Sequence, residues 1–223
     1  MIDFLDVSFA KEDAFPVFVD LNVSIGRADR VFISGPMSLG RNEFISLLGG
    51  FDFPDKGVVS VFGDNVARLD VARIALMRKR IGFLLEESAL LSNLKVIENV
   101  ALPLMFHEEL SDEQCMQKAE ERLSEIGYKN DIWMQPATLS LLEKKLVLCA
   151  RALITDPQIV VCSDIFDDLS ASECGAIADF IASYQSERKD CSVVYLLDSG
   201  QDPAFTRPTR VMRFEGKKIL EVF

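Results

Sequence analysis

The sequence predicts an α/β fold with a parallel core sheet, an antiparallel edge and an inserted helical subdomain. Strand-like apolar runs occur near both ends of the chain, helix signals alternate with them, and the region 96–153 is predicted to be helical. The 223 residues suffice for one domain with a subdomain, and two unrelated domains are not expected.

The amino-terminal region contains short apolar segments typical of strands, two of which enclose a segment with helical character. The predicted elements are strands at 2–9, 17–25, 31–34, 56–62 and 81–85 and a helix at 69–80. A glycine-containing turn and an apolar helix follow the third strand. We therefore place residues 1–86 in the α/β core.

The remaining chain is predicted to leave the core and then return to it. Ser111 is a helix start signal with acids after it, and residues 130–136 carry loop signals. After Asp156-Pro157 the β/α pattern resumes, with strands at 159–162, 193–197, 211–214 and 218–223 and a helix at 172–186. This pattern predicts a helical subdomain at 87–155 and a second part of the core at 156–223.

The charge and the cysteines exclude several classes of function. Lys and Arg number 24 against 35 Asp and Glu, so the formal net charge is −11, which disfavours nucleic-acid binding. The five cysteines form no CxxC pair and His107 is the only histidine, so neither a zinc cluster nor a disulfide framework is predicted. No apolar stretch reaches the roughly 18 residues of a membrane span, and Asp3 and Asp6 disfavour a secretion signal. We expect a cytoplasmic protein that reaches a membrane only through partners.

A candidate phosphate-binding loop follows the strand VFIS. It reads Gly35, Pro36, Met37, Ser38, Leu39, Gly40, Arg41 and Asn42, and an apolar helix begins near Glu43. Glycines at this spacing let backbone N–H groups turn toward an anion, and the helix start adds partial positive charge. The same pattern also fits a plain strand-to-helix turn, so the loop alone leaves both readings open.

Several further segments, in their order along the chain, are specific in combination. They include IDFLDVSF, LLGGFDFPDKGVVSVFGD, RKRIGFLLEESALLSNLKVIENVALPL and ARALITDPQIVV. Over essentially its whole length the chain resembles the nucleotide-binding subunit of ATP-binding cassette (ABC) transporters. The resemblance implies a P-loop NTPase core of the ABC type. Around 88–104 the sequence is similar to the family branch that serves lipid-trafficking importers.

The phosphate loop departs from the family pattern. In working members a lysine and backbone amides hold the β- and γ-phosphates, and a hydroxyl and a carboxylate place Mg²⁺. Here Arg41 stands at the lysine position and Asn42 at the hydroxyl position, while Ser38 and Leu39 replace small residues. A forked guanidinium does not simply replace a compact ammonium, and an amide is a poor partner for Mg²⁺. We expect weak ATP binding and doubtful Mg²⁺ binding.

The Walker B segment also departs from the pattern. Ser163 stands where the Mg²⁺-associated Asp belongs, and Asp164 stands where the general-base Glu belongs. An Asp is one methylene shorter than a Glu, and a misplacement near 1 Å can cost roughly 100-fold in rate. Shifting the alignment by one residue makes Asp164 the metal-side acid but places Ile165 at the base position. Asp164 could also be an ordinary acid at a strand end.

The remaining contact loops differ in the same way. The Gln after the strand at 81–85 is Glu86, and the His after the strand at 193–197 is Asp198. In the family, the signature LSGGQ acts on ATP held by the opposite subunit. In this chain it reads Leu139, Ser140, Leu141, Leu142 and Glu143. Two leucines would fill the space that glycines leave for the γ-phosphate, and a competent partner subunit would not fully rescue this chain.

Together these observations predict an ABC-type nucleotide-binding subunit whose ATP hydrolysis is lost or strongly impaired. It would be a structural or regulatory partner of a membrane permease, at the inner face of the membrane, beside a second ABC ATPase subunit or a second copy of itself. Residues 88–106 are expected to dock the permease. One alternative is a slow ATPase that uses Arg41 and Asp164, and another is an anion sensor without turnover.

Overall fold

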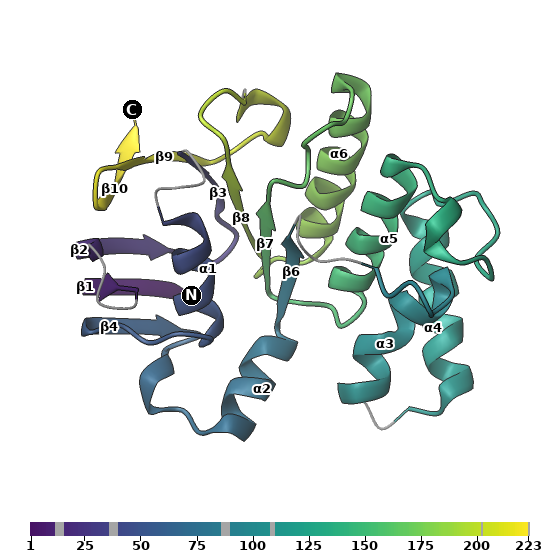
Figure 1. Cartoon of the computed structure of the whole chain (residues 1–223), viewed down its shortest axis with the longest axis horizontal. Coiled ribbons are helices and arrows are strands. Elements are labelled where there is room, and N and C mark those ends of the chain that lie inside the picture. The colour runs from purple at the N-terminus through teal and green to yellow at the C-terminus, as the bar shows by residue number, and fades with distance from the viewer. Residues whose placement is uncertain (12–15, 36–39, 86–89, 108–109, 202, 223) are drawn as a thin grey trace.

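A four-stranded antiparallel sheet forms one side of the molecule. The computed structural model describes residues 1–11, 16–35, 40–85, 90–107, 110–201 and 203–222. The antiparallel sheet has the strand order β2-β1-β4-β5 (Figure 1). Its strands are β1 (Ile2–Ala10), β2 (Pro16–Ile25), β4 (Lys56–Val61) and β5 (Asp64–Asn65).

The central sheet has six strands in the order β10-β9-β3-β8-β7-β6. They are β3 (Arg30–Ser34), β6 (Ile81–Leu85), β7 (Ile159–Ser163), β8 (Ser192–Leu197), β9 (Arg210–Glu215) and β10 (Lys218–Val222). All neighbours from β9 to β6 are parallel, and β10 pairs antiparallel with β9. Every residue of β7 and β8 is buried, which explains their continuous apolar sequences.

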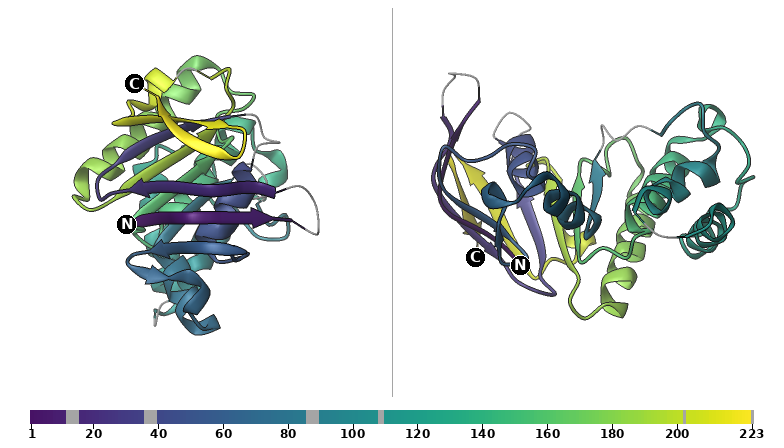
Figure 2. Two further views of the ribbon diagram at one scale, coloured as in Figure 1. Left: turned by 90° about the vertical axis from the view of Figure 1, so that its left-hand side faces the viewer. Right: turned by 90° about the horizontal axis from the view of Figure 1, so that it is seen from below.

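Six α-helices and three short 3₁₀ helices are present in the described part of the chain. The α-helices are α1 (Arg41–Gly49), α2 (Val71–Lys79), α3 (Val96–His107), α4 (Asp112–Glu125), α5 (Leu141–Leu153) and α6 (Ala171–Glu187). The 3₁₀ helices are η1 (Val66–Arg68), η2 (Pro136–Thr138) and η3 (Pro203–Thr206). Helices α3, α4 and α5 gather on the side of the molecule opposite the antiparallel sheet (Figures 1 and 2).

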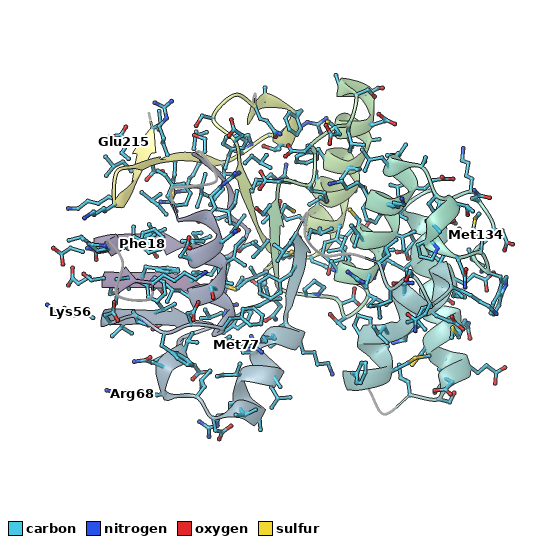
Figure 3. The ribbon with its side chains drawn as sticks, viewed as in Figure 1. Phe18, Lys56, Arg68, Met77, Met134 and Glu215 are labelled. Atoms are coloured by element: carbon cyan, nitrogen blue, oxygen red, sulfur yellow. The ribbon has the colours of Figure 1, made fainter. Side chains whose placement is uncertain are left out.

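The central sheet separates two hydrophobic cores. Val161 of β7 and Leu196 of β8 face the core shared with α1 and the antiparallel sheet. Cys162 and Tyr195, their neighbours in sequence, face the core shared with α3 to α6. Figure 3 marks the two ends of the molecule, with Met134 beside the helices and Lys56 on the antiparallel sheet. The end of β7 therefore lies where α1 and α5 approach the sheet from opposite faces.

The predicted fold class is confirmed. The observed strands and helices agree with the predicted ones within a few residues, and β10 forms the antiparallel edge. The sequence pattern did not separate the first strands into a sheet of their own, because alternation shows that a strand is half-buried but not which strand it pairs with. The division into 1–86 with 156–223 and 87–155 stays a prediction, and α3, α4 and α5 all lie within the second range.

None of the described helices combines the length and the apolar character needed to cross a bilayer.

Candidate functional site

The candidate phosphate loop connects β3 to α1. Gly40, immediately before α1, has φ 90°, and a Cβ there would lie 2.7 Å from Val17 Cγ1 and 2.9 Å from the Phe18 ring. A Cβ on Gly35 would lie 2.8 Å from Phe214 Cβ. Both glycines are therefore needed for backbone packing whether or not an anion binds. Pro36, Met37, Ser38 and Leu39 lie outside the described residues.

Arg41, the first residue of α1, is turned into the protein and is only 1% exposed. Its Nη1 donates a hydrogen bond of 2.6 Å to Oδ1 of Asp164, which follows β7 directly and is 4% exposed. Ser163 Oγ donates to the other carboxylate oxygen, Oδ2, at 3.1 Å. Asp164 has φ 52°, a conformation rare for residues other than glycine. The three predicted site residues Arg41, Ser163 and Asp164 therefore lie together.

In this ion pair, the positive charge of Arg41, which a phosphate loop would offer to a nucleotide, is paired with the Asp164 carboxylate. Its side chains are 2% and 6% exposed, so solvent does not screen the attraction. Removing one partner of such a pair typically costs about 3–5 kcal/mol, because the other charge stays buried and unpaired. Arg41 Nε has no hydrogen-bond partner among the described residues. The charge of the guanidinium is thus committed to Asp164, although one of its N–H groups is unsatisfied there.

A second cation lies beneath the same turn. Lys145 of α5 is 5% exposed, and its Nζ lies 3.5 Å from the backbone oxygen of Asp164, to which it donates. Gln201 Nε2 donates a hydrogen bond of 2.7 Å to Oδ1 of the half-buried Asp167. Burial and the negative charge of Asp164 raise the pKa of Asp167, while Lys145, Gln201 and Arg41 oppose that rise.

Sequence analysis did not identify Lys145, Asp167 or Gln201 as parts of the site. One signal was available for Lys145, because it is four residues before Cys149 and therefore on the same face of α5 as this buried residue. A lysine on the apolar face of a helix requires a counter-charge. Nothing comparable in the sequence marks Gln201, which joins the site from the segment after β8.

An acidic cleft of about 320 Å³ borders the ion pair. Its charged lining residues are Lys11, Glu43, Asp52 and Asp164, with three acids against one lysine. Ser46 donates a hydrogen bond of 2.6 Å to Asp52, and Asn42 is exposed on the same wall. Among the described residues, no group of three His, Cys, Asp or Glu side chains could hold a metal ion. Because Asp164 is paired with Arg41, the charges left on the described lining are Glu43 and Asp52 against Lys11.

The candidate signature loop begins α5 and forms a helix cap. Ser140 Oγ accepts a hydrogen bond from Glu143 N at 3.3 Å, and Glu143 Oε2 accepts one from Ser140 N at 2.7 Å. Asn130 donates to Glu143 Oε1 at 3.0 Å, and the hydrogen bonds with Ser140 lower the pKa of Glu143. The Glu143 carboxylate therefore caps its own helix. Leu141 is 41% exposed and Leu142 is half-buried.

One predicted contact residue lies apart from the buried cluster. Asp198 is exposed, and its Oδ1 accepts a hydrogen bond of 3.0 Å from Gly200 N within its own turn. Glu86 lies outside the described residues.

Comparisons with known proteins agree with the fold. The family model described as ABC transporter matches residues 18–166. The methionine import ATP-binding protein MetN of Caulobacter vibrioides is 30% identical over 217 residues, which is 90% of this chain and 65% of that protein. The lipoprotein-releasing system ATP-binding protein LolD of Psychrobacter arcticus is 28% identical, with 76% of each chain covered. The chain thus spans less than two thirds of the length of the first of these relatives.

Another relative and a solved structure extend these findings. The intermembrane phospholipid transport system ATP-binding protein MlaF of Escherichia coli K12 is 25% identical over 83% of this chain and 69% of that protein. The dimeric ATP-binding cassette MJ0796, bound to ADP and Pi, superimposes with a TM-score of 0.86 over 98% of this chain and 96% of that one. Its sequence identity is 23%, so this likeness supports the fold alone.

Replacing Arg41 with Met should lower the free energy of unfolding by about 3–5 kcal/mol, because Asp164 is left buried without its cation. The double variant Arg41→Met/Asp164→Leu removes both charges and should recover part of that loss, with the strain of a leucine at φ 52° as the part that remains. Urea unfolding at neutral pH measures both effects.

Arg27→Met is a matched control, because Arg27 pairs with Asp190 at 69% and 60% side-chain exposure. Its effect should stay below about 1 kcal/mol. An Arg41→Met protein as stable as the wild type would show that the buried pair does not form.

Proposed function

This chain belongs to the ABC transporter family, and we propose that it is a nucleotide-binding-type subunit of a membrane transport complex with lost or strongly impaired ATP hydrolysis. One observation carries the proposal: the buried ion pair between Arg41 and Asp164. These residues stand at the positions that in the family serve the phosphates and the attacking water. Here each neutralises the other.

Hydrolysis needs a carboxylate that is free to orient and deprotonate water near the γ-phosphate. Both oxygens of the Asp164 carboxylate are already engaged, one by Arg41 and the other by Ser163. Ser163 itself offers only a hydroxyl where the family places the acid beside Mg²⁺. Among the described residues, the site therefore offers neither an available base nor a metal-side acid.

We propose that ATP binds weakly and that Mg²⁺ adds little to its affinity. For Arg41 to face a phosphate it must leave Asp164, and a cost of about 3 kcal/mol corresponds to roughly 100-fold weaker binding. Ser163 and Asn42 provide neutral oxygens, which hold Mg²⁺ less well than carboxylates do. The acids Glu43 and Asp52 add repulsion in the neighbouring cleft.

The proposed partners are a membrane permease and either a second ABC ATPase subunit or a second copy of this chain. A partner's nucleotide would meet Leu141 and Leu142 instead of two glycines, and Glu143 caps its own helix. An intact partner would therefore gain little from this signature loop. These features favour a structural or regulatory role beside the catalytic subunit, on the inner face of the membrane.

A cavity of about 310 Å³ between α2, β6, α3 and α5 supports docking of the permease. Phe106 of α3 lines it and is 76% exposed, and Leu102 and Pro103 line the same wall. Arg78 and Arg151 add positive charge around this apolar wall. In the family this region receives a helix of the membrane subunit, and an exposed phenylalanine at a cavity rim is suited to that contact.

Purified protein should release phosphate from Mg-ATP no faster than background, because the base, the metal-side acid and the loop cation are all altered. A phosphate-release assay compares the wild type with Arg41→Met/Asp164→Leu, which lacks both charges but should remain folded. A clear wild-type rate that disappears in this variant would establish the slow-ATPase alternative instead.

Millimolar Mg-ATP should leave the melting temperature nearly unchanged. A ligand present at 100 times its dissociation constant stabilises a protein by about 2.7 kcal/mol, which a thermal-shift titration detects easily. Titrations with ATP, ADP and inorganic phosphate, each with and without Mg²⁺, separate nucleotide binding from anion binding. Micromolar ATP binding that requires Mg²⁺ would contradict weak binding.

Phe106→Glu should abolish co-purification with the membrane subunit, because it places a charge on the docking surface. The stable variant Arg41→Met/Asp164→Leu should keep the partner. Leu220→Glu, at a residue 45% exposed on β10, controls for adding a surface charge far from the helices. If Phe106→Glu retains the partner while the double variant loses it, assembly depends on the phosphate site, and the membrane subunit does not dock at the cavity lined by Phe106.

A further inference from the structure

Lys145 is a buried charge that the proposed function does not use. It is 5% exposed, and among the described residues its Nζ donates one hydrogen bond, 3.5 Å long, to the backbone oxygen of Asp164. Lysines are almost never buried this fully unless they are paired. A single long bond to a carbonyl compensates a buried ammonium poorly, so a counter-charge is expected from the carboxylates of the turn that Lys145 contacts.

Those carboxylates belong to the turn after β7. Asp164 is paired with Arg41, and Asp167 is held by Gln201 at 2.7 Å. The charge of Lys145 lowers the pKa of Asp167, which burial and Asp164 raise. Arg41 and Lys145 therefore bring two positive charges to a turn that carries two carboxylates, and Asp167 is the one of these four residues that is not buried.

The members come from separate parts of the fold. Arg41 begins α1 on one face of the central sheet, and Lys145 lies on α5 at the other face, with the end of β7 between them (Figure 1). Gln201 joins from the segment after β8. A set of charges contributed from both faces of a sheet resists separation of those faces, because moving one member leaves another unpaired.

We infer that Lys145 completes an internal counter-ion network that fixes α5 against the end of β7 without nucleotide or metal. The acids of this turn need a nearby cation, and α5 supplies it from within the chain. The packing of α5 on the core is therefore set by the protein's own charges. This inference does not depend on which partner the chain serves.

Two cysteines report on this contact. Cys149 lies one turn after Lys145 on α5. Cys162 lies on β7, directly before Ser163, and both cysteines are 0% exposed. Burial raises the pKa of Cys149 to about 12 and the pKa of Cys162 well above its usual value. Because the thiolate is the reactive form, these thiols are labelled only when α5 separates from β7.

The test is native-state thiol labelling with peptide mapping. Lys145→Met should raise the labelling rates of Cys149 and Cys162 by about tenfold or more, which corresponds to about 1.4 kcal/mol of easier opening. Cys115 on α4, also 0% exposed, is the internal reference and should change little. Lys144→Met removes the adjacent, half-buried lysine and should behave as the wild type.

Two further arms keep the test decisive if Lys145→Met folds poorly. Lys145→Met/Asp167→Asn removes one charge of each sign and should return the rates toward the wild type, and Mg-ATP should not alter wild-type labelling. Equal rates in Lys145→Met and Lys144→Met would overturn the inference. So would a uniform rise at all three cysteines, or a tenfold slowing of wild-type labelling by Mg-ATP, because the network would then not be the element that fixes α5.

Discussion

The buried ion pair between Arg41 and Asp164 is the interaction on which the rest of the site depends. A guanidinium that is 1% exposed must have an anion, and in this chain the anion is a carboxylate of the protein instead of a phosphate. This choice fixes the start of α1 against the end of β7. The proposed loss of hydrolysis and the packing of the core would then have one physical cause.

Much of the fold could be predicted because it follows from local patterns. The continuous apolar sequences of β7 and β8 indicated buried parallel strands, and Ser111 correctly marked the start of α4. The site could be predicted only as a set of positions. The direction of Arg41 depends on a partner 123 residues away, and the burial of Lys145 depends on how α5 packs on the sheet. Neither is encoded in neighbouring residues.

The start of α5 shows how a departure from a motif can serve another purpose. Glu143 and Ser140 form a reciprocal cap that satisfies backbone donors at the helix start, and caps of this kind are worth about 1 kcal/mol. Ser170 and Glu173 make the same arrangement at the start of α6. At the start of α5, a residue that differs from the family pattern thus contributes to helix stability, which needs no ligand.

The mutual dependence of Arg41 and Asp164 limits which single substitutions the site can accommodate. A single substitution toward the family pattern would place a side chain of different size or charge among neighbours that pack around the present residue. Ser163→Asp would place a second carboxylate beside Asp164, and Asp164→Glu would add a methylene to a side chain that is 6% exposed. Arg41→Lys would replace a guanidinium whose Nη1 lies 2.6 Å from its acceptor with a group of different reach. Each single substitution toward the family pattern is thus expected to lower stability, and a stable protein with the family residues is expected to need coordinated changes.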